Sequence, residues 1–469
     1  MAPPHLALVL SLVCLLHSVR SLSLSRGFTF KSNSEYISHL ETIAKLPKGF
    51  SVGSSRFFFT PTEVDASLPM NLTIIKLDHP TESFAAMFTS NQFPGGPIIV
   101  GKKRIATSNV LQAIVINNKI SNVCPGSGVS DRGVGDSDEI CSSVAEYMQL
   151  ESKNLVIPSS TGIIGWRLPV SAIKNAIPDT AMSMQAESAL PAAMGITTTD
   201  RYPKIRSYVS KRGVPWSVVG IAKGAGMIEP NMATMLCYIM TDLDVKRNHL
   251  QEHLEIAVSK SFNTISVDGD QSTSDTILAL SSNVHACYDS KEFQDALNEV
   301  CCGLAEDIVR NGEGTQHVIK VAVKGAPSDS FAKELGRFVV NSNLVKCAIY
   351  GCDPNVGRIV GAIGSFLGKF EDGSKYTRGL SVDINDQNIF ADGAFSLNPT
   401  LEKILSDSMV KAQLYSDDIP EIDRNYPPHD KTVNINIALD YDSSNVGKCT
   451  VIGSDLTKDY VEVNADYRS

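Results

Sequence analysis

Short apolar runs, rich in β-branched residues and bounded by Gly, Pro or Asn, recur along the chain. Runs of about four to eight residues with this composition and these boundaries predict strands. In the N-terminal half they are NLTIIKL (71–77), PIIVGKK (97–103), LQAIVINN (111–118), NLVIPSS (154–160), SVVGIAK (217–223) and MLCYIMTDL (235–243). Nearer the C-terminus they are HVIKVAVKG (317–325), INIALDY (435–441) and TVIGSDL (450–456).

Segments with helical spacing lie between these runs. Residues 246–262 place Leu250, Leu254, Ala257 and Ser261 on one stripe, as a helix packed against a sheet does. Folded sequence is expected to begin near residue 47, and helices mixed with strands on short connections predict an α/β sandwich. Further helices are predicted at 139–150, 293–310 and 328–342, and a loop at 125–137 (PGSGVSDRGVGDS).

Composition is that of a globular protein with a large core. The 469 residues are 43% hydrophobic and 20% charged, which predicts two or three packed layers and two domains. The net charge of −9 and the lack of a basic block argue against nucleic-acid binding, which needs clustered Lys and Arg.

The cysteines and two short motifs do not predict a metal site. Ten cysteines include no CxxC pair, and their density is low for a disulfide framework, so buried thiols are expected. His249, Glu252 and His253 match the HxxEH pattern of zinc peptidases, but the two histidines flank an apolar helical stripe and are interpreted as a solvated edge. VDGDQSTSDT (267–276) lacks the glutamate at position twelve of a calcium loop and predicts an Asx turn.

The N-terminal 45 residues predict a targeting segment. Residues 6–16 (LALVLSLVCLL) form an apolar run too short to span a bilayer but typical of a signal-peptide core. The serine-rich stretch after it holds basic but no acidic residues before Glu35, which is typical of a transit peptide. Together they predict import into a plastid through the secretory route, with the mitochondrial matrix as the alternative. A secreted protein would expose the sequon at 71–73, which instead lies in a predicted strand.

The segment KGAGMIEPNMATML (223–236) carries the candidate chemistry. A threonine hydroxyl is a poor nucleophile unless a base holds its proton. An N-terminal threonine supplies that base itself, because its α-amino group titrates at about 7.7–8.0. Cleavage before Thr234 would create one, Ala233 leaves the bond uncrowded, and Gly224 and Gly226 permit a strained backbone. A buried strand threonine is the alternative on this loop alone.

This segment resembles the autoprocessing segment of the ornithine acetyltransferases, the bifunctional glutamate N-acetyltransferases of the cyclic arginine pathway. The resemblance runs from about residue 47 to the C-terminus and includes several motifs in one order. They are SSTGIIG (159–165), TTTDRYPK (197–204), SFNTISVDGDQSTSDT (261–276), NGEGTQHV (311–318), NSNLVKCAIYGCDPNVGR (341–358) and NADYRS (464–469). The resemblance implies a layered αββα sandwich, also typical of β-peptidyl aminopeptidases.

The same resemblance implies roles for individual residues. Thr234 would be the nucleophile and Ala233-Thr234 the cleaved bond, giving an α chain of residues 46–233 and a β chain of 234–469. Thr161 and Gly162 would form the oxyanion hole. A carboxylate such as Glu313 suits the ornithine ammonium, and Lys223 suits a carboxylate or an oxyanion. The residues implied in substrate binding are Thr198, Lys223, Thr234, Glu313, Asn464 and Ser469.

The implied reaction is a ping-pong acetyl transfer. Thr234 takes the acetyl group of N-acetylornithine, and glutamate then removes it as N-acetylglutamate. The reaction needs no metal or cofactor, and in bifunctional members acetyl-CoA is a second donor. The resemblance also implies a heterotetramer of two α and two β chains.

Two departures and two rival functions remain open. Val356 replaces the tryptophan usual in DPNWGR, and VINNKISNVCPGSG (115–128) lacks the expected small-residue pattern, so substrate preference is uncertain. The rivals are an N-terminal-nucleophile amidohydrolase of similar fold, in which water replaces glutamate, and an inactive scaffold. Lys223 and Glu313 together suit a zwitterionic amino acid and favour transfer.

Overall fold

The computed structural model describes most of the chain after its N-terminal segment. The described residues are 30, 32–126, 129–211, 213–229, 235–415, 426, 429–440 and 446–465. The apolar run at 6–16, the cleavage residues Ala233 and Thr234, and Ser469 lie outside them. No helix among the described residues is long and apolar enough to cross a membrane.

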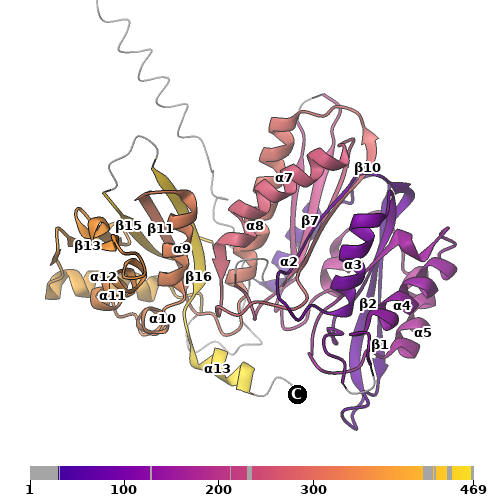
Figure 1. The fold of residues 1–469 in the computed structure, drawn as a ribbon, viewed down its shortest axis with the longest axis horizontal. Helices are drawn as coiled ribbons and strands as arrows, with labels where there is room; N and C mark the ends of the chain where they lie inside the picture. Colours follow the sequence, from indigo (N-terminus) through magenta and orange to yellow (C-terminus); the bar gives the residue numbers. More distant parts are fainter. Residues whose placement is uncertain are drawn as a thin grey trace, which may run out of the picture.

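Two mixed sheets form the larger lobe, on the right in Figure 1. The first has the order β1 (Phe50–Phe59), β2 (Leu68–Thr81), β4 (Leu111–Asn117), β5 (Val156–Ser160). The second has the order β3 (Phe84–Phe88), β10 (Thr276–His285), β8 (Leu236–Leu243), β7 (Ser217–Lys223), β6 (Lys204–Val209).

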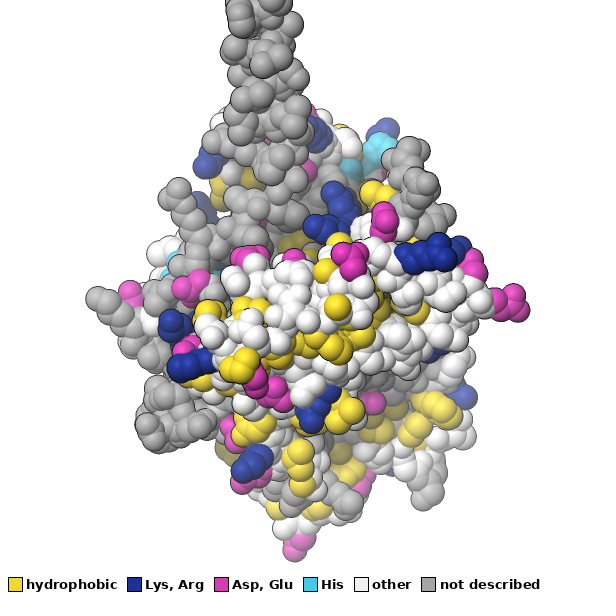
Figure 2. Space-filling model, turned by 90° about the vertical axis from the view of Figure 1, so that its left-hand side faces the viewer, with side chains coloured by type: hydrophobic (Ala, Val, Ile, Leu, Met, Phe, Trp, Pro, Cys, Tyr) yellow, Lys and Arg dark blue, Asp and Glu magenta, His cyan; other side chains and the backbone are white. Residues whose placement is uncertain are grey.

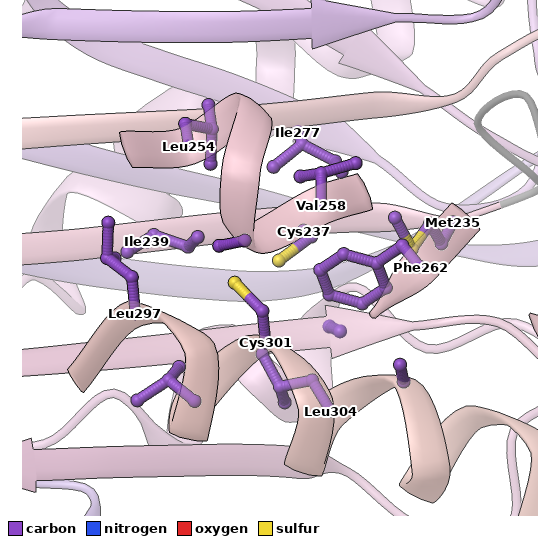
Figure 3. Packing of buried hydrophobic residues seen from close by; sticks show 14 of the residues in the cluster. Met235, Cys237, Ile239, Leu254, Val258, Phe262, Ile277, Leu297, Cys301 and Leu304 are labelled. Carbon is purple, nitrogen blue, oxygen red and sulfur yellow. The ribbon is translucent and has the colours of Figure 1, made fainter. Parts of the chain in front are cut away.

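The two sheets face each other and carry helices on their outer faces. Ile114 and Ile116 of β4 share a buried cluster with Tyr238 and Met240 of β8. Outside the first sheet lie α4 (Val134–Tyr147) and α5 (Val170–Met182), and outside the second lie α7 (Arg247–Lys260) and α8 (Ser290–Arg310). Figure 3 shows the outer face of β8 packed between α7 and α8. The layers confirm the αββα sandwich.

A third sheet forms the smaller lobe. Its order is β14 (Ala394–Phe395), β13 (Gln387–Ala391), β12 (Ser381–Ile384), β15 (Val433–Ala438), β11 (Val318–Ala326), β16 (Gly447–Ser454), β9 (Ile265–Ser266). Its helices are α9 (Asp329–Val340), α10 (Asn343–Tyr350), α11 (Val356–Leu367) and α12 (Pro399–Ala412). Figure 2 faces this lobe and shows hydrophobic side chains beside charged ones. Phe395 of β14 and Ile404 and Val410 of α12 are exposed.

Three further helices are α2 (Asn33–Ile43), α6 (Leu190–Gly195) and α13 (Lys458–Ala465). Because α2 buries Tyr36 and Leu40, the folded chain begins before residue 47, where it was expected to start. In Figure 1, α13 leaves the smaller lobe after β16 and runs beneath the gap between the lobes toward the larger one. Residues near the C-terminus therefore reach the sheets of the larger lobe.

Most predicted strands and helices are confirmed, with one clear error. Residues 97–103, predicted as a strand, form part of α3 (Gly96–Thr107). Pro97 occupies the first turn, where its missing N–H costs nothing. Pro97, Val100, Gly101 and Arg104 are buried on one face of the helix and Ile98 is buried as well, so this apolar run belongs to a helix packed into the core. The predicted loop at 125–137 is wrong at its end, because α4 begins at Val134.

The histidines of the HxxEH pattern have a structural role. His253 is 8% exposed, and its ring nitrogens lie 2.7 Å from Gln294 Oε1 and 2.6 Å from Tyr288 OH. His249 stacks on the Tyr288 ring. His253 is thus buried, not solvated as predicted. Across the described ranges no group of three His, Cys, Asp or Glu side chains is arranged to hold a metal ion.

The described cysteines are all free thiols, and only some are buried. Cys237 of β8 and Cys301 of α8 point toward each other in the core (Figure 3), and burial raises the pKa of both thiols. Cys124 and Cys347 are exposed, which corrects the expectation of buried thiols at those two positions.

Lys346 gives the smaller lobe a pH-dependent stability. Its Nζ donates to the Val267 carbonyl in a buried site, and burial lowers its pKa from 10.5 to about 8 against the opposing charges of Asp455 and Asp268. Between these two pH values the unfolded chain holds a proton that the native state has lost, so stability rises with pH across this window. Below about pH 8 both states are protonated and the contribution of this group is flat.

Replacing Lys346 by Met is expected to remove this gain. The difference in Tm between wild type and variant should therefore increase in favour of wild type from pH 8 to 10, as thermal unfolding followed by circular dichroism would show. Lys411→Met changes an exposed lysine of α12 and is the matched control. A difference that stays constant over this range would contradict the assignment.

Candidate active site

The turn after β5 presents two unpaired donors. Gly162 has φ +122°, and a Cβ there would lie 2.1 Å from the Lys119 carbonyl oxygen, so only glycine fits. The Ile163 N–H donates to that carbonyl at 2.9 Å and holds the turn. Within the described part of the chain, neither the Gly162 N–H nor the Thr161 hydroxyl has a hydrogen-bond partner. Thr161 is 2% exposed, so both donors stand at the edge of a buried region.

This turn lies beside the start of β8. Tyr238 OH donates to Ser159 Oγ at 2.8 Å, which joins β8 to the end of β5. Lys223, the last residue of β7, pairs in register with Leu236, the first residue of β8. The two donors after β5 and the Lys223 side chain therefore lie near the start of β8, which Met235 directly precedes. Thr234, which is bonded to Met235, lies outside the described residues.

A buried carboxylate holds two ammonium groups at this strand end. Lys223 is 3% exposed, and its Nζ donates to Thr198 Oγ1 at 3.2 Å. Burial lowers the pKa of Lys223, against the opposing charge of Asp200. Asp200 accepts hydrogen bonds from the Gly224 N–H at 2.8 Å, from the Thr198 N–H at 3.0 Å and from Lys204 Nζ. Burial would raise the pKa of Asp200, but Lys204 and Lys223 keep it below its usual value.

Glu313 is fixed on the same side. Thr199 Oγ1 donates to its Oε1 at 2.7 Å, and Asn464 Nδ2 of α13 donates to its Oε2 at 2.9 Å. A Cβ at Gly226 would lie 2.3 Å from Oε2, so the glycine-rich segment makes room for the carboxylate. The Glu313 N–H donates to the Ala225 carbonyl at 2.9 Å. Asn464 thus reaches a residue of the predicted site.

A cavity of about 500 Å³ opens at this place. Gly162 and Thr198 line it, whereas Thr161, Lys223, Glu313 and Asn464 adjoin it through the contacts above. Ser469 lies outside the described residues. The cavity is lined by Arg56, Pro69, Met70, Asn71, Asn118, Lys119, Gly162, Ile163, Thr197, Thr198, Thr199, Glu462 and Val463.

Asp275 is a site residue that the sequence did not single out. Its Oδ1 accepts a hydrogen bond from the Met235 N–H at 2.9 Å. Its Oδ2 is buried without a hydrogen-bond partner among the described side chains, and burial raises its pKa well above the usual value. Asp200 and Thr199 were also missed. The only signal was that these residues stand inside the motifs TTTDRYPK and QSTSDT.

The departure at Val356 lies elsewhere. Val356 begins α11 and is 4% exposed in the core of the smaller lobe, so it does not line the cavity. The other departure, at 115–128, does contribute to the lining, through Asn118 and Lys119. Of the two, only this second departure can touch a substrate in the cavity.

Taken together, these groups suit acyl transfer on an amino acid. Two unpaired donors on one turn can stabilise a developing oxyanion. A buried ammonium and a fixed carboxylate can bind the two charged ends of a zwitterion.

The ArgJ family model matches residues 62–469. The arginine biosynthesis bifunctional protein ArgJ 2 of Clostridium acetobutylicum is 39% identical over 387 residues, 82% of this chain and 90% of that protein. Glutamate N-acetyltransferase of Methanosarcina mazei is 35% identical over 404 residues, 85% of this chain and 94% of that protein. The crystal structure of ornithine acetyltransferase complexed with ornithine from Mycobacterium tuberculosis is 25% identical with a TM-score of 0.34, covering 40% of this chain and 95% of that one.

Proposed function

Because this chain belongs to the ArgJ family, we propose that it transfers the acetyl group of N-acetylornithine to glutamate through an ester on Thr234. The observation that best supports this proposal is the pair of unpaired donors, the Thr161 hydroxyl and the Gly162 N–H, beside the start of β8. Donors placed where negative charge develops are a large part of catalysis in acyl transfer.

The reaction proceeds in two balanced halves. Thr234 Oγ attacks the acetyl carbonyl, and its proton passes to the α-amino group that self-cleavage at Ala233-Thr234 has freed. Collapse of the oxyanion breaks the amide bond, and ornithine leaves with that proton, which gives an acetyl-threonine ester. The amine of glutamate then attacks the ester, Thr234 Oγ regains a proton, and N-acetylglutamate leaves.

The described residues bind and orient the donor. Lys223, with Thr198, holds the α-carboxylate of N-acetylornithine by a charge-assisted contact. Glu313, held by Thr199 and Asn464, takes the side-chain ammonium. Charged contacts in such a buried site are strong, because leaving either charge without its partner there would cost free energy. We also propose that Ser469 takes part in substrate binding.

Further parts of the proposal concern processing and location. Residues 46–233 and 234–469 would form the α and β chains, assembled as two of each. Within the predicted segment 1–45, the residues before α2 would direct the protein to a plastid, with the mitochondrial matrix as the alternative, because α2 itself packs into the core. Acetyl-CoA would serve as a second donor for glutamate, and no metal or other cofactor takes part.

The test is a burst experiment. Incubation of the processed enzyme with N-acetylornithine alone should release about one ornithine per site and acetylate Thr234, as a ping-pong mechanism requires. Adding glutamate should restore turnover and produce N-acetylglutamate. Steady release of acetate without glutamate would instead indicate an amidohydrolase. A processed chain with neither burst nor turnover would indicate a scaffold. A parallel reaction with acetyl-CoA and glutamate tests the second donor.

Glu313→Gln should separate the two substrates. It keeps the size of the side chain but removes the charge that binds ammonium, so KM for N-acetylornithine should rise about 10–100-fold while KM for glutamate changes less. Steady-state kinetics with each substrate varied in turn would measure this. Equal increases in both KM values would mean that Glu313 does not bind the side-chain ammonium of N-acetylornithine.

A further inference from the structure

Two cationic side chains line the cavity at the end of the first sheet. Arg56 lies on β1 and Lys119 in the turn after β4. Arg56 pairs in register with Asn71 of β2, and Asn117 of β4 pairs with Ser160 of β5. One end of this sheet therefore carries both cations along with the turn of Thr161 and Gly162.

The Arg56 and Lys119 side chains differ from the other cations of the region in having no hydrogen-bond or ion-pair partner among the described residues. Lys223 Nζ donates to Thr198 Oγ1, and Arg206 of β6 donates to both oxygens of Asp307. By contrast, neither the Arg56 guanidinium nor the Lys119 ammonium forms an ion pair or a hydrogen bond with any residue in the described ranges. The one acidic side chain in the lining is Glu462 of α13, which is exposed.

The turn that carries Lys119 is held rigidly. Asn118 Oδ1 accepts from the Asn71 N–H at 2.7 Å, and Asn118 Nδ2 donates to the Thr197 carbonyl at 2.6 Å. The Lys119 carbonyl itself accepts from the Ile163 N–H at 2.9 Å. Lys119 is thus anchored directly against the Gly162 turn. This is the segment, 115–128, that departs from the small-residue pattern of the family.

The chemistry of the two substrates requires such cations. The donor ends in an ammonium and the acceptor in a carboxylate, although both share an α-carboxylate. Glu313 attracts the ammonium but repels the side-chain carboxylate of glutamate, so one subsite cannot serve both ends. We propose that Arg56 and Lys119 bind the side-chain carboxylate of the acceptor and so select glutamate in the second half-reaction. This inference rests on the function proposed above.

The geometry of an arginine favours this assignment. A guanidinium binds a carboxylate through two parallel hydrogen bonds, and a lysine adds a point charge beside it. Gly162 lines the same cavity, so an acceptor held by Arg56 and Lys119 lies in the space where the acetyl ester must be attacked. Glu462 opposes the same carboxylate and weakens its binding.

The experiment compares the two half-reactions in Arg56→Gln, Lys119→Gln and the double variant. The burst of ornithine measures acetylation, and the release of N-acetylglutamate from the acetylated enzyme measures acceptor attack. The rate of the ornithine burst should change little, whereas the second-order rate constant for attack by glutamate should fall about tenfold for each charge removed. With glutamine as acceptor the variants should lose much less, so the preference for glutamate should shrink. Arg56→Lys should recover part of the loss.

Two further variants serve as controls, one neutral and one with the opposite expected effect. Lys103→Gln removes an exposed charge of α3 outside the cavity and should behave as wild type. Glu462→Gln should lower KM for glutamate, the opposite sign to the cation variants. An intact burst with an unchanged rate toward glutamate in the double variant would overturn the inference and leave the proposed function standing.

The remaining outcomes distinguish failure of the inference from failure of the proposed function and from misfolding. If the variants raise only KM for acetyl-CoA, the two cations bind its phosphates, and the inference is overturned. A wild-type enzyme with no burst would refute the proposed function itself, before any variant is compared. Thermal unfolding of each variant, compared with Lys103→Gln, identifies a change in rate that follows merely from misfolding.

Discussion

Thr234→Ala is expected to leave a single uncut chain that transfers no acetyl group. The side chain that attacks the preceding carbonyl during cleavage is the same one that later carries the acetyl ester, so one substitution removes both reactions. Without cleavage the α-amino base is also missing. The loss of activity should therefore be at least as large as that for removing a catalytic nucleophile, on the order of 10⁴-fold or more.

Intact-mass measurement and N-terminal sequencing of the purified protein would check this. Wild type should give a second chain that starts at Thr234, and the variant should not. Thr234→Ser keeps a hydroxyl and should still cut. Thr241→Ala is the control for stability, because Thr241 is buried on β8 and donates to the Ser217 carbonyl at 2.8 Å. Normal cleavage in Thr234→Ala would rule out the proposed nucleophile.

The central strands β4 and β8 of the two facing sheets could be predicted because they are buried on both faces, whereas β1, β3, β6 and β10 were not predicted. Such strands read as continuous apolar runs, and every residue of β8 and of β4 is buried. The same argument fails at 97–103, where an apolar run of similar length lies on α3. Periodicity does not distinguish a short buried strand from a buried helix turn, and here Pro97 was the better signal.

The site could be predicted only in part, because its contacts join distant parts of the chain. The motifs contained Glu313 and Asn464, but not the information that the two side chains touch. Asp275 reaches the Met235 N–H only because β10 lies beside β8 in parallel register. Its burial, which raises its pKa, likewise belongs to the fold and not to the spacing of residues.

The cations of the cavity illustrate the same limit. Arg56 stands in an exposed strand position and Lys119 in a turn, and both would pass for ordinary surface residues in the sequence. What distinguishes their side chains is the lack of a hydrogen-bond or ion-pair partner among the described residues, together with a place in the lining of one cavity. Neither property is visible before the sheet end is assembled.

Thr161→Ala is expected to lower kcat about 10²–10³-fold, with a smaller change in KM. The hydroxyl of Thr161 and the N–H of Gly162 are the two donors of one turn, and the substitution removes one while the other remains. The fold should tolerate it, because the Thr161 N–H still donates to the Asn117 carbonyl at 3.1 Å. The hydroxyl forms no other bond within the described part of the chain that its removal would break.

If the Thr161 hydroxyl stabilises the oxyanion, Thr161→Ala must destabilise the transition state and not the bound substrate. Removing a donor that contacts the oxyanion but not the substrate carbonyl lowers kcat and kcat/KM together. Both the ornithine burst and the attack by glutamate should slow, since each half-reaction passes through an oxyanion. Thr161→Ser, which keeps the hydroxyl, should retain most of the rate in both. A wild-type kcat in Thr161→Ala would remove this residue from the site and leave Gly162 as the only donor of that turn.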